Sequence, residues 1–265
     1  MFARLVRETG LDVGFSDAAT VGEVFDEAFA TLRRAGLRNE YVYRAALVNN
    51  VLMGTHSLRT ASMLTEFRAV SSKADLVILN GTATVYEIKS ERDSLGRLAK
   101  QITDYQRVFA KVFVIAGADH IEEVAKQVPE HVGILCLKRW NRISTIRDAQ
   151  SCLELIDSSC VLDSLRSSEA KLVLERVGLS VPNVPNTKMR AALLEEFEQL
   201  DTDVLHRTMV AVLKSSRNLS SLHYFVQKMP LSLQAAALTY KIQKSQHDNL
   251  IKAVSTPFAS ARHWV

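Results

Sequence analysis

Two oppositely charged residues stand two positions apart inside an otherwise apolar stretch of the chain. The segment TVYEIKSERDSLGRLAKQITDYQ (residues 84–106) begins within the β-rich run TATVYEIK, which contains Glu87 and Lys89. Side chains alternate along a strand, so these two project from the same face. A charged pair on a face predicted to be core indicates a chemical role, and the alternative is an ion-paired strand in an ordinary α/β domain.

A third charged residue, Asp75, lies near the start of the preceding β-rich run, ADLVILN. If the hairpin loop consists of residues 80–82, Asp75 lies directly opposite Glu87. A two-residue Asn-Gly turn would pair Asp75 with Tyr86 instead and would place the two acids on opposite faces. The site therefore requires an odd-length loop or a bulge.

Two neighbouring carboxylates on an apolar face repel each other, and one of them tends to be protonated. A bound divalent cation removes this cost, and carboxylate oxygens favour Mg²⁺ or Mn²⁺. With a cation held by Asp75 and Glu87, Lys89 could orient or deprotonate an attacking water. This chemistry suits phosphodiester hydrolysis and needs no covalent nucleophile.

The elements around these residues predict an α/β domain. Helical spacing occurs over residues 20–53, 94–110 and 120–128, and Asn39 and Ser94 are the expected N-caps. Short turns join the first three β-rich runs and predict an antiparallel meander, whereas the helix after the third predicts a parallel pair. The five runs are MLTEFRAV, ADLVILN, TATVYEIK, KVFVIAGA and VGILCLK. The predicted fold is a mixed central sheet with helices on both sides.

These features resemble the PD-(D/E)xK nuclease superfamily. Asp75, eleven further residues and then Glu87-Ile88-Lys89 are similar to its signature, although Ala74 stands where the signature has proline. Gln101 and Tyr105 in the following helix match the QxxxY motif of its RecB-like branch. The element order αβββαβ is similar to the restriction-endonuclease-like core. The resemblance covers about residues 38–140 and is nearest to small bacterial members whose substrates are unassigned.

The resemblance implies a role for each matched residue. Lys89 would position the water, and Gln101 and Tyr105 would contact that water or the scissile strand. The implied catalytic residues are Asp75, Glu87, Lys89, Gln101 and Tyr105. The implied ligands of Mg²⁺ (or Mn²⁺) are Glu40 from the first core helix, Asp75, Glu87 and the main-chain carbonyl of Ile88.

Several nearby residues have two interpretations each. Arg68 and Lys73 flank the site and could bind the phosphates of a nucleic acid, or they could be ordinary solvent-facing charges. Glu66 could supply a further metal ligand or pair with Arg68 on the surface. Tyr105 could be a core residue whose hydroxyl is bonded elsewhere.

The chain divides into three predicted parts: an N-terminal helical segment (1–37), a nuclease-like α/β core (38–147) and a helical C-terminal region (148–265). Residues 201–265 contain eight Lys/Arg and three Asp/Glu, which fits a polyanionic partner without requiring one. Residues 162–198 weakly resemble DNA-binding helix–loop–helix modules of SAP type. A plain helical hairpin is the alternative for that segment.

The predicted function is a metal-dependent deoxyribonuclease, acting in DNA repair, mobile-element biology or phage defence. One alternative is a catalytically silent module of the same fold that binds nucleic acid or a protein partner, as an immunity or inhibitor protein does. A ribonuclease of the same mechanism is another, because the motif selects phosphate and metal. No apolar run is long enough to cross a membrane and MFARLVRETG is no signal peptide, so a cytoplasmic protein is expected. The three cysteines are expected to be buried free thiols.

Overall fold

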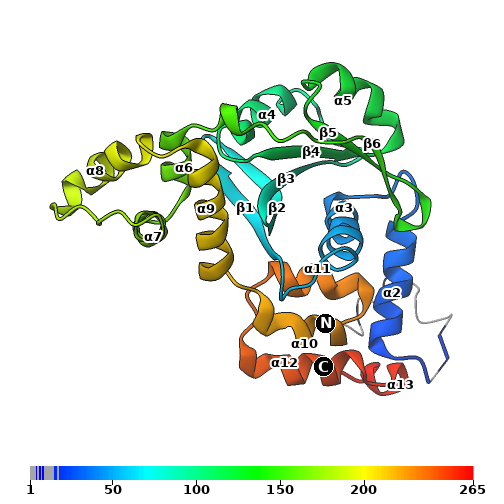
Figure 1. Ribbon diagram of the computed structural model, residues 1–265. Coiled ribbons are helices and arrows are strands. Elements are labelled where there is room, and N and C mark those ends of the chain that lie inside the picture. Colours follow the sequence, from blue (N-terminus) through cyan, green and yellow to red (C-terminus); the bar gives the residue numbers. More distant parts are fainter. Residues whose placement is uncertain (1–3, 5, 7, 9–14, 17, 265) are drawn as a thin grey trace.

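A computed structural model of the protein describes residues 4, 6, 8, 15, 16 and 18–264. A central sheet is surrounded by helices (Figure 1). The predicted N-terminal helical segment 1–37 lies partly outside the described residues. Its described part includes α2 (Val21–Leu32), which Thr20 caps by accepting a hydrogen bond from the Glu23 N–H.

The sheet has six strands in the order β1-β2-β3-β4-β5-β6. The first three pair antiparallel, and β3 pairs parallel with β4 across α4 (Leu98–Gln106), so the predicted meander and parallel pair are confirmed. A second parallel pair joins β4 to β5 across α5 (Ile121–Gln127). The strands are β1 (Ser62–Ala69), β2 (Ser72–Asn80), β3 (Thr82–Lys89), β4 (Lys111–Ala116), β5 (Gly133–Leu137) and β6 (Ile143–Arg147).

Two local predictions were wrong. The sixth strand, β6, was not expected, because its sequence ISTIR has only two apolar residues and lies half-exposed at the sheet edge, antiparallel to β5. Ser94 does not cap α4, which begins at Leu98 after Arg97. The Ser94 hydroxyl instead accepts a hydrogen bond from the Gly96 N–H in the loop before the helix.

Helix α3 (Glu40–Leu47) begins as predicted, because the Asn39 side chain accepts a hydrogen bond from the Val42 N–H. It continues as a π-helical turn, Val48–Leu52. Such single turns often occur near functional sites. The helix lies under the sheet and brings Glu40 to the rim of the site described below (Figure 1).

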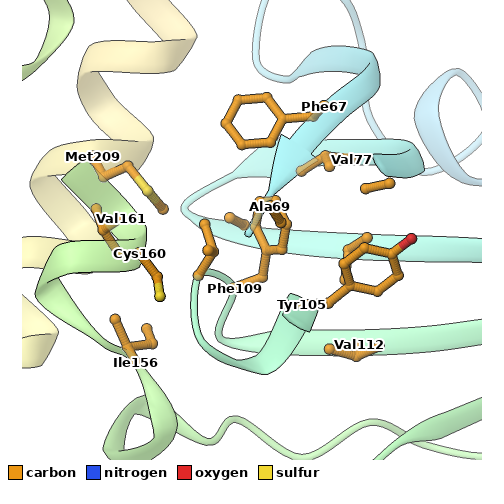
Figure 2. Packing of buried hydrophobic residues seen from close by; sticks show 14 of the residues in the cluster. Phe67, Ala69, Val77, Tyr105, Phe109, Val112, Ile156, Cys160, Val161 and Met209 are labelled. Carbon is orange, nitrogen blue, oxygen red and sulfur yellow. The ribbon is translucent and has the colours of Figure 1, made fainter. Parts of the chain in front are cut away.

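Strand alternation divides the apolar residues between two cores, one on each face of the sheet. On one face Val77 and Val85 pack with Tyr105 of α4 and with the helices from α6 to α9. Figure 2 shows part of this core, where Phe67, Phe109 and Met209 converge. On the other face Leu76, Ile78 and Tyr86 pack with α3 and with helices from the C-terminal region.

The C-terminal region is helical, as predicted, and it contributes to both cores. Its helices are α6 (Ser158–Ser164), α7 (Ser167–Arg176), α8 (Asn186–Glu198), α9 (Thr202–Ser216), α10 (His223–Lys228), α11 (Leu231–Thr239), α12 (His247–Val254) and α13 (Phe258–Ala261). None of the helices that the structure describes combines the length and apolar character needed to span a membrane. Cys136, Cys152 and Cys160 are free and buried, as expected.

Candidate active site

The hairpin between β2 and β3 has the odd-length register that the site requires. Asn80 pairs with Thr82 around Gly81, whose φ of 71° lies in the left-handed region that glycine adopts without strain. Leu76 pairs with Tyr86, and one more step along this register places Asp75 opposite Glu87. A carboxylate oxygen of Asp75 accepts a hydrogen bond from the Ile88 N–H at 2.7 Å. The two acids therefore lie on the same face, with Lys89.

Glu87 is buried and receives hydrogen bonds at both carboxylate oxygens. Its Oε1 lies 2.7 Å from Lys89 Nζ and 2.6 Å from Gln101 Nε2, and Lys89 Nζ also lies 2.8 Å from Gln101 Oε1. Its Oε2 lies 2.7 Å from the hydroxyl of Tyr105. Four of the five predicted catalytic residues thus form one hydrogen-bonded cluster.

Tyr105 is a core residue, as one interpretation predicted, and its hydroxyl also belongs to this cluster. Its ring is fully buried beside β2 and β4 (Figure 2). Its hydroxyl lies 2.8 Å from the Lys73 carbonyl oxygen as well as near Glu87. Burial and the charge of Glu87 raise the pKa of Tyr105 well above its usual range. The hydroxyl therefore keeps its proton and acts as a donor.

A cleft of 270 Å³ opens above the cluster. Asp75 lies in this cleft and is partly exposed. Burial raises the pKa of Asp75 to about 7, and the negative charges of Glu87 and Glu40 contribute to this rise. The hydrogen bond from the Ile88 N–H acts in the opposite direction and lowers the pKa. An acid whose charge is disfavoured in this way gains most from a bound cation. The cleft is lined by Glu40, Asp75, Glu87, Ile88, Lys89, Asp93, Ser94, Gly96, Arg97 and Gln101.

Glu40, Glu66 and Asp75 each place a carboxylate oxygen within 4.8 Å of the other two. Two oxygens that bind one Mg²⁺ lie at most about 4.2 Å apart, since each Mg–O bond is about 2.1 Å. The three oxygens are thus near the spacing of a hard divalent cation, and their chemistry fits Mg²⁺ or Mn²⁺.

Glu66 joins this group through an unusual backbone conformation. Thr65 pairs with Leu76 and Phe67 with Ala74, but Glu66 between them has a φ of 52°. A left-handed conformation costs a non-glycine residue of order 1–3 kcal/mol, and such strain gathers at functional sites. The predicted partner of Glu66 was Arg68, but Glu66 pairs with Lys73 at 3.7 Å.

The two residues predicted to bind phosphates lie outside the cleft. Arg68 is exposed and donates to the Val70 carbonyl, whereas Lys73 is exposed beside Glu66. Asp93 and Arg97 line the cleft instead, and sequence reasoning missed them. Both lie in the segment SERDSLGR (residues 90–97). Its only signal was its position directly between the strand with Lys89 and the helix with Gln101.

Two comparisons relate the chain to a bacteriophage protein, over a range that includes the cleft. The sequence model described as "Bacteriophage P4 protein cII" matches residues 33–241, which include every cleft residue. Protein cII of Enterobacteria phage P4 is 30% identical over 159 residues, covering 59% of this chain and 52% of that protein. The chain therefore spans about half the length of this relative. No solved structure matches the chain.

Proposed function

This chain belongs to the bacteriophage P4 protein cII family, and we propose that it is a metal-dependent nuclease of the PD-(D/E)xK type. The proposed reaction is hydrolysis of a DNA phosphodiester bond by water, in the cytoplasm. One observation carries the proposal: Glu87, buried at the base of a polar cleft, is held by Lys89, Gln101 and Tyr105, with Asp75 opposite.

A purely structural ion pair would explain this arrangement less well. Buried salt bridges add little stability, because the desolvation of both charges offsets their attraction. Lys89 forms an ion pair with Glu87, while the nearby Asp75 carboxylate accepts from the Ile88 main chain and faces the cleft. A silent module would be expected to neutralise both acids with the lysine and to close the space above them.

The acids of the cleft, together with the neighbouring Glu66, would hold the cation. Glu40, Glu66 and Asp75 supply three oxygens, and Glu87 retains an acceptor site because a carboxylate has about four and three are used. When bound, a divalent cation supplies a Lewis acid for the phosphoryl oxygen and positive charge for the leaving oxygen.

The protein's own groups position the water. Lys89 Nζ has three N–H groups; two are directed to Glu87 and Gln101, which leaves the third for a water or phosphate oxygen in the cleft. Gln101 accepts from Lys89 and donates to Glu87, so it fixes both side chains. In the reaction, the water oxygen bonds to phosphorus as the bond from phosphorus to the leaving oxygen breaks. The attacking water loses a proton to solvent and the leaving oxygen takes one from solvent, so the products are a phosphate monoester and an alcohol.

The test is cleavage of single- and double-stranded DNA in Mg²⁺, Mn²⁺ or EDTA. Wild type is compared with Glu87→Gln and Lys89→Met, which keep the side-chain size. Asp163→Asn is the matched control, because Asp163 is an exposed acid that pairs with Arg190 outside the cleft. We expect metal-dependent cleavage that falls about 100-fold or more in both cleft variants and is unchanged in the control.

Circular dichroism of each variant separates loss of activity from loss of fold. No cleavage of DNA by folded wild type in either metal would overturn the proposal and favour the silent module. Cleavage of RNA alone would identify a ribonuclease instead. Cleavage that survives both cleft substitutions would show that the active residues lie elsewhere.

A further inference from the structure

Trp140 is exposed to an unusual degree for a tryptophan. It lies between β5 and β6, and 85% of its surface is accessible. Both Trp140 and the next residue, Asn141, have left-handed backbones, with φ of 61° and 59°. Bulky residues rarely adopt this conformation, so the surrounding structure must impose it. Nothing in the core or in the proposed cleavage site uses this indole.

Hydrogen bonds hold the segment in this shape. The Lys138 N–H donates to the Arg142 carbonyl at 2.8 Å and closes the turn. The buried guanidinium of Arg38 donates to the carbonyls of Leu137 and Lys138 at 2.8 and 3.3 Å. Asn50 donates to the Asn141 carbonyl at 2.9 Å. The turn is therefore rigidly built, and it presents the indole outward.

The indole borders a basic cavity of 440 Å³. The connection between β5 and β6 that carries it lies beside the end of α2 (Figure 1). The cavity is lined by Ala30, Arg33, Arg34, Ala35, Arg38, Arg139 and Trp140. Segments 33–38 and 138–142 contain six basic residues and no acidic residue. Among the residues that the structure describes, the acid paired with this group is Glu91, 3.7 Å from Arg38. The basic side chains and the exposed indole together fit a polyanion with flat, stackable groups.

This Trp140 surface is physically connected to the cleft. Arg38, which supports the turn, is two residues before Glu40, which lines the cleft. On the other side, the segment that follows Lys89 reaches the same place, because Glu91 pairs with Arg38 and Arg92 donates to the Gly36 carbonyl. The Trp140 surface and the cleft are thus built on the same neighbouring segments, 33–40 and 89–92.

We propose that the Trp140 surface binds single-stranded DNA, with a base stacked on the indole and the exposed Arg34 and Arg139 on the phosphates, and leads the strand to the cleft. The second half of this statement rests on the proposed nuclease function. Stacking on an exposed aromatic ring requires an unpaired base, because bases within a duplex are already stacked on each other. A duplex would meet the protruding indole without any free base face. The substrate class is therefore DNA with a single-stranded segment.

The test measures binding in EDTA, so that no cleavage takes place. A fluorescein-labelled oligothymidylate is titrated with wild type, Trp140→Ala and Arg139→Gln, and anisotropy gives Kd at several salt concentrations. The matched control is Tyr240→Ala, which removes an exposed aromatic ring (68% accessible) that does not line the cavity. A Trp264→Phe variant leaves Trp140 as the sole tryptophan, so its emission reports stacking directly.

We expect Trp140→Ala to weaken binding roughly 5- to 150-fold, the range for loss of one stacked base. Arg139→Gln should lower the slope of log K against log salt by about 0.7, whereas Trp140→Ala should leave that slope unchanged. Tyr240→Ala should bind as wild type, and DNA should quench the emission of Trp140.

Unchanged binding by Trp140→Ala, or tighter binding of duplex DNA or RNA than of single-stranded DNA, would overturn the inference. The two proposals fail separately. Binding through Trp140 without any cleavage in Mg²⁺ would refute the nuclease but keep the binding surface. If Trp140→Ala cleaves single-stranded DNA at the wild-type rate and affinity, the proposed nuclease function stands and the proposed role of the Trp140 surface in DNA binding is refuted.

Discussion

Replacing Asp75 by asparagine should make the protein more stable while abolishing the proposed nuclease activity. The side chain keeps its size, and its amide oxygen can still accept the hydrogen bond that Ile88 donates to Asp75. The substitution removes a negative charge that faces Glu40 and Glu87, and the new N–H groups can donate to neighbouring acids. In the absence of metal, the wild-type acid should therefore destabilise the fold.

The size of this effect follows from the pKa of Asp75. The pKa is about 7 in the folded protein and ordinarily 3.8. This difference lowers the free energy of unfolding by at most about 4 kcal/mol above pH 7. Because the side chain is partly open to the cleft, solvent screening reduces this to about 1–2 kcal/mol. For a chain of this size, that free energy shifts Tm by about 2–8 °C.

The pH dependence fixes the sign of the effect. A carboxyl with a raised pKa binds more protons in the folded than in the unfolded state between pH 3.8 and about 7. Wild-type stability should therefore fall relative to Asp75→Asn as the pH rises through that range. Below the ordinary pKa both side chains are neutral, and the difference should disappear.

The assay is thermal unfolding of both proteins in EDTA across this pH range, repeated in Mg²⁺ at high pH. A cation at 100 times its Kd stabilises the protein it binds by about 2.7 kcal/mol, which should erase the advantage of Asp75→Asn or reverse it. A variant that is less stable than wild type in EDTA at high pH would refute the reasoning. It would mean that hydrogen bonds satisfy the Asp75 charge without any cation.

Two further predictions concern groups outside the cleft. His206 is buried, accepts a hydrogen bond from the Ala83 N–H at 3.3 Å, and has its pKa lowered to about 4 by burial. As the pH falls from 6.5 to 4, the free energy of unfolding of wild type, measured with urea, should fall by about 3 kcal/mol, because folding keeps His206 neutral. That of His206→Gln should not fall in this way, and equal losses in both proteins would contradict the prediction. Arg217→Met should lower the free energy of unfolding by about 3 kcal/mol, because it leaves the buried carboxylate of Glu169 without its cationic partner. A double variant that also carries Glu169→Leu should recover most of this loss.

The sequence predicts the strands and helices that carry the site more fully than it predicts the register between those strands. Short turns predicted the meander, helical spacing predicted the crossover helix, and strand alternation predicted the shared face of Glu87 and Lys89. Alternation alone could not choose the register of Asp75, because an Asn-Gly pair suits both an even and an odd loop. The structure resolves this through a single-residue turn at Gly81.

Other features depend on tertiary contacts and leave no local signal. The left-handed backbone of Glu66 is imposed within β1, and no residue preference would predict it for a glutamate. β6 pairs at the sheet edge despite a largely polar sequence, because β5 provides its partner. The conformation of Trp140 depends on Arg38, about a hundred positions earlier in the chain.

Three independent geometric conditions meet at Glu87. Alternation in β3 brings Lys89 to its face, the four-residue spacing in α4 brings Gln101 and Tyr105 together, and the odd hairpin brings Asp75 opposite. An ion-paired strand in an ordinary α/β domain would need only the first condition. The helical spacing and the hairpin register are not needed for that ion pair. Each nevertheless brings polar side chains next to the buried Glu87 carboxylate, beneath the cleft. Their coincidence is what a site for a cation and a phosphate requires, and it is the reason to test this chain as an enzyme first.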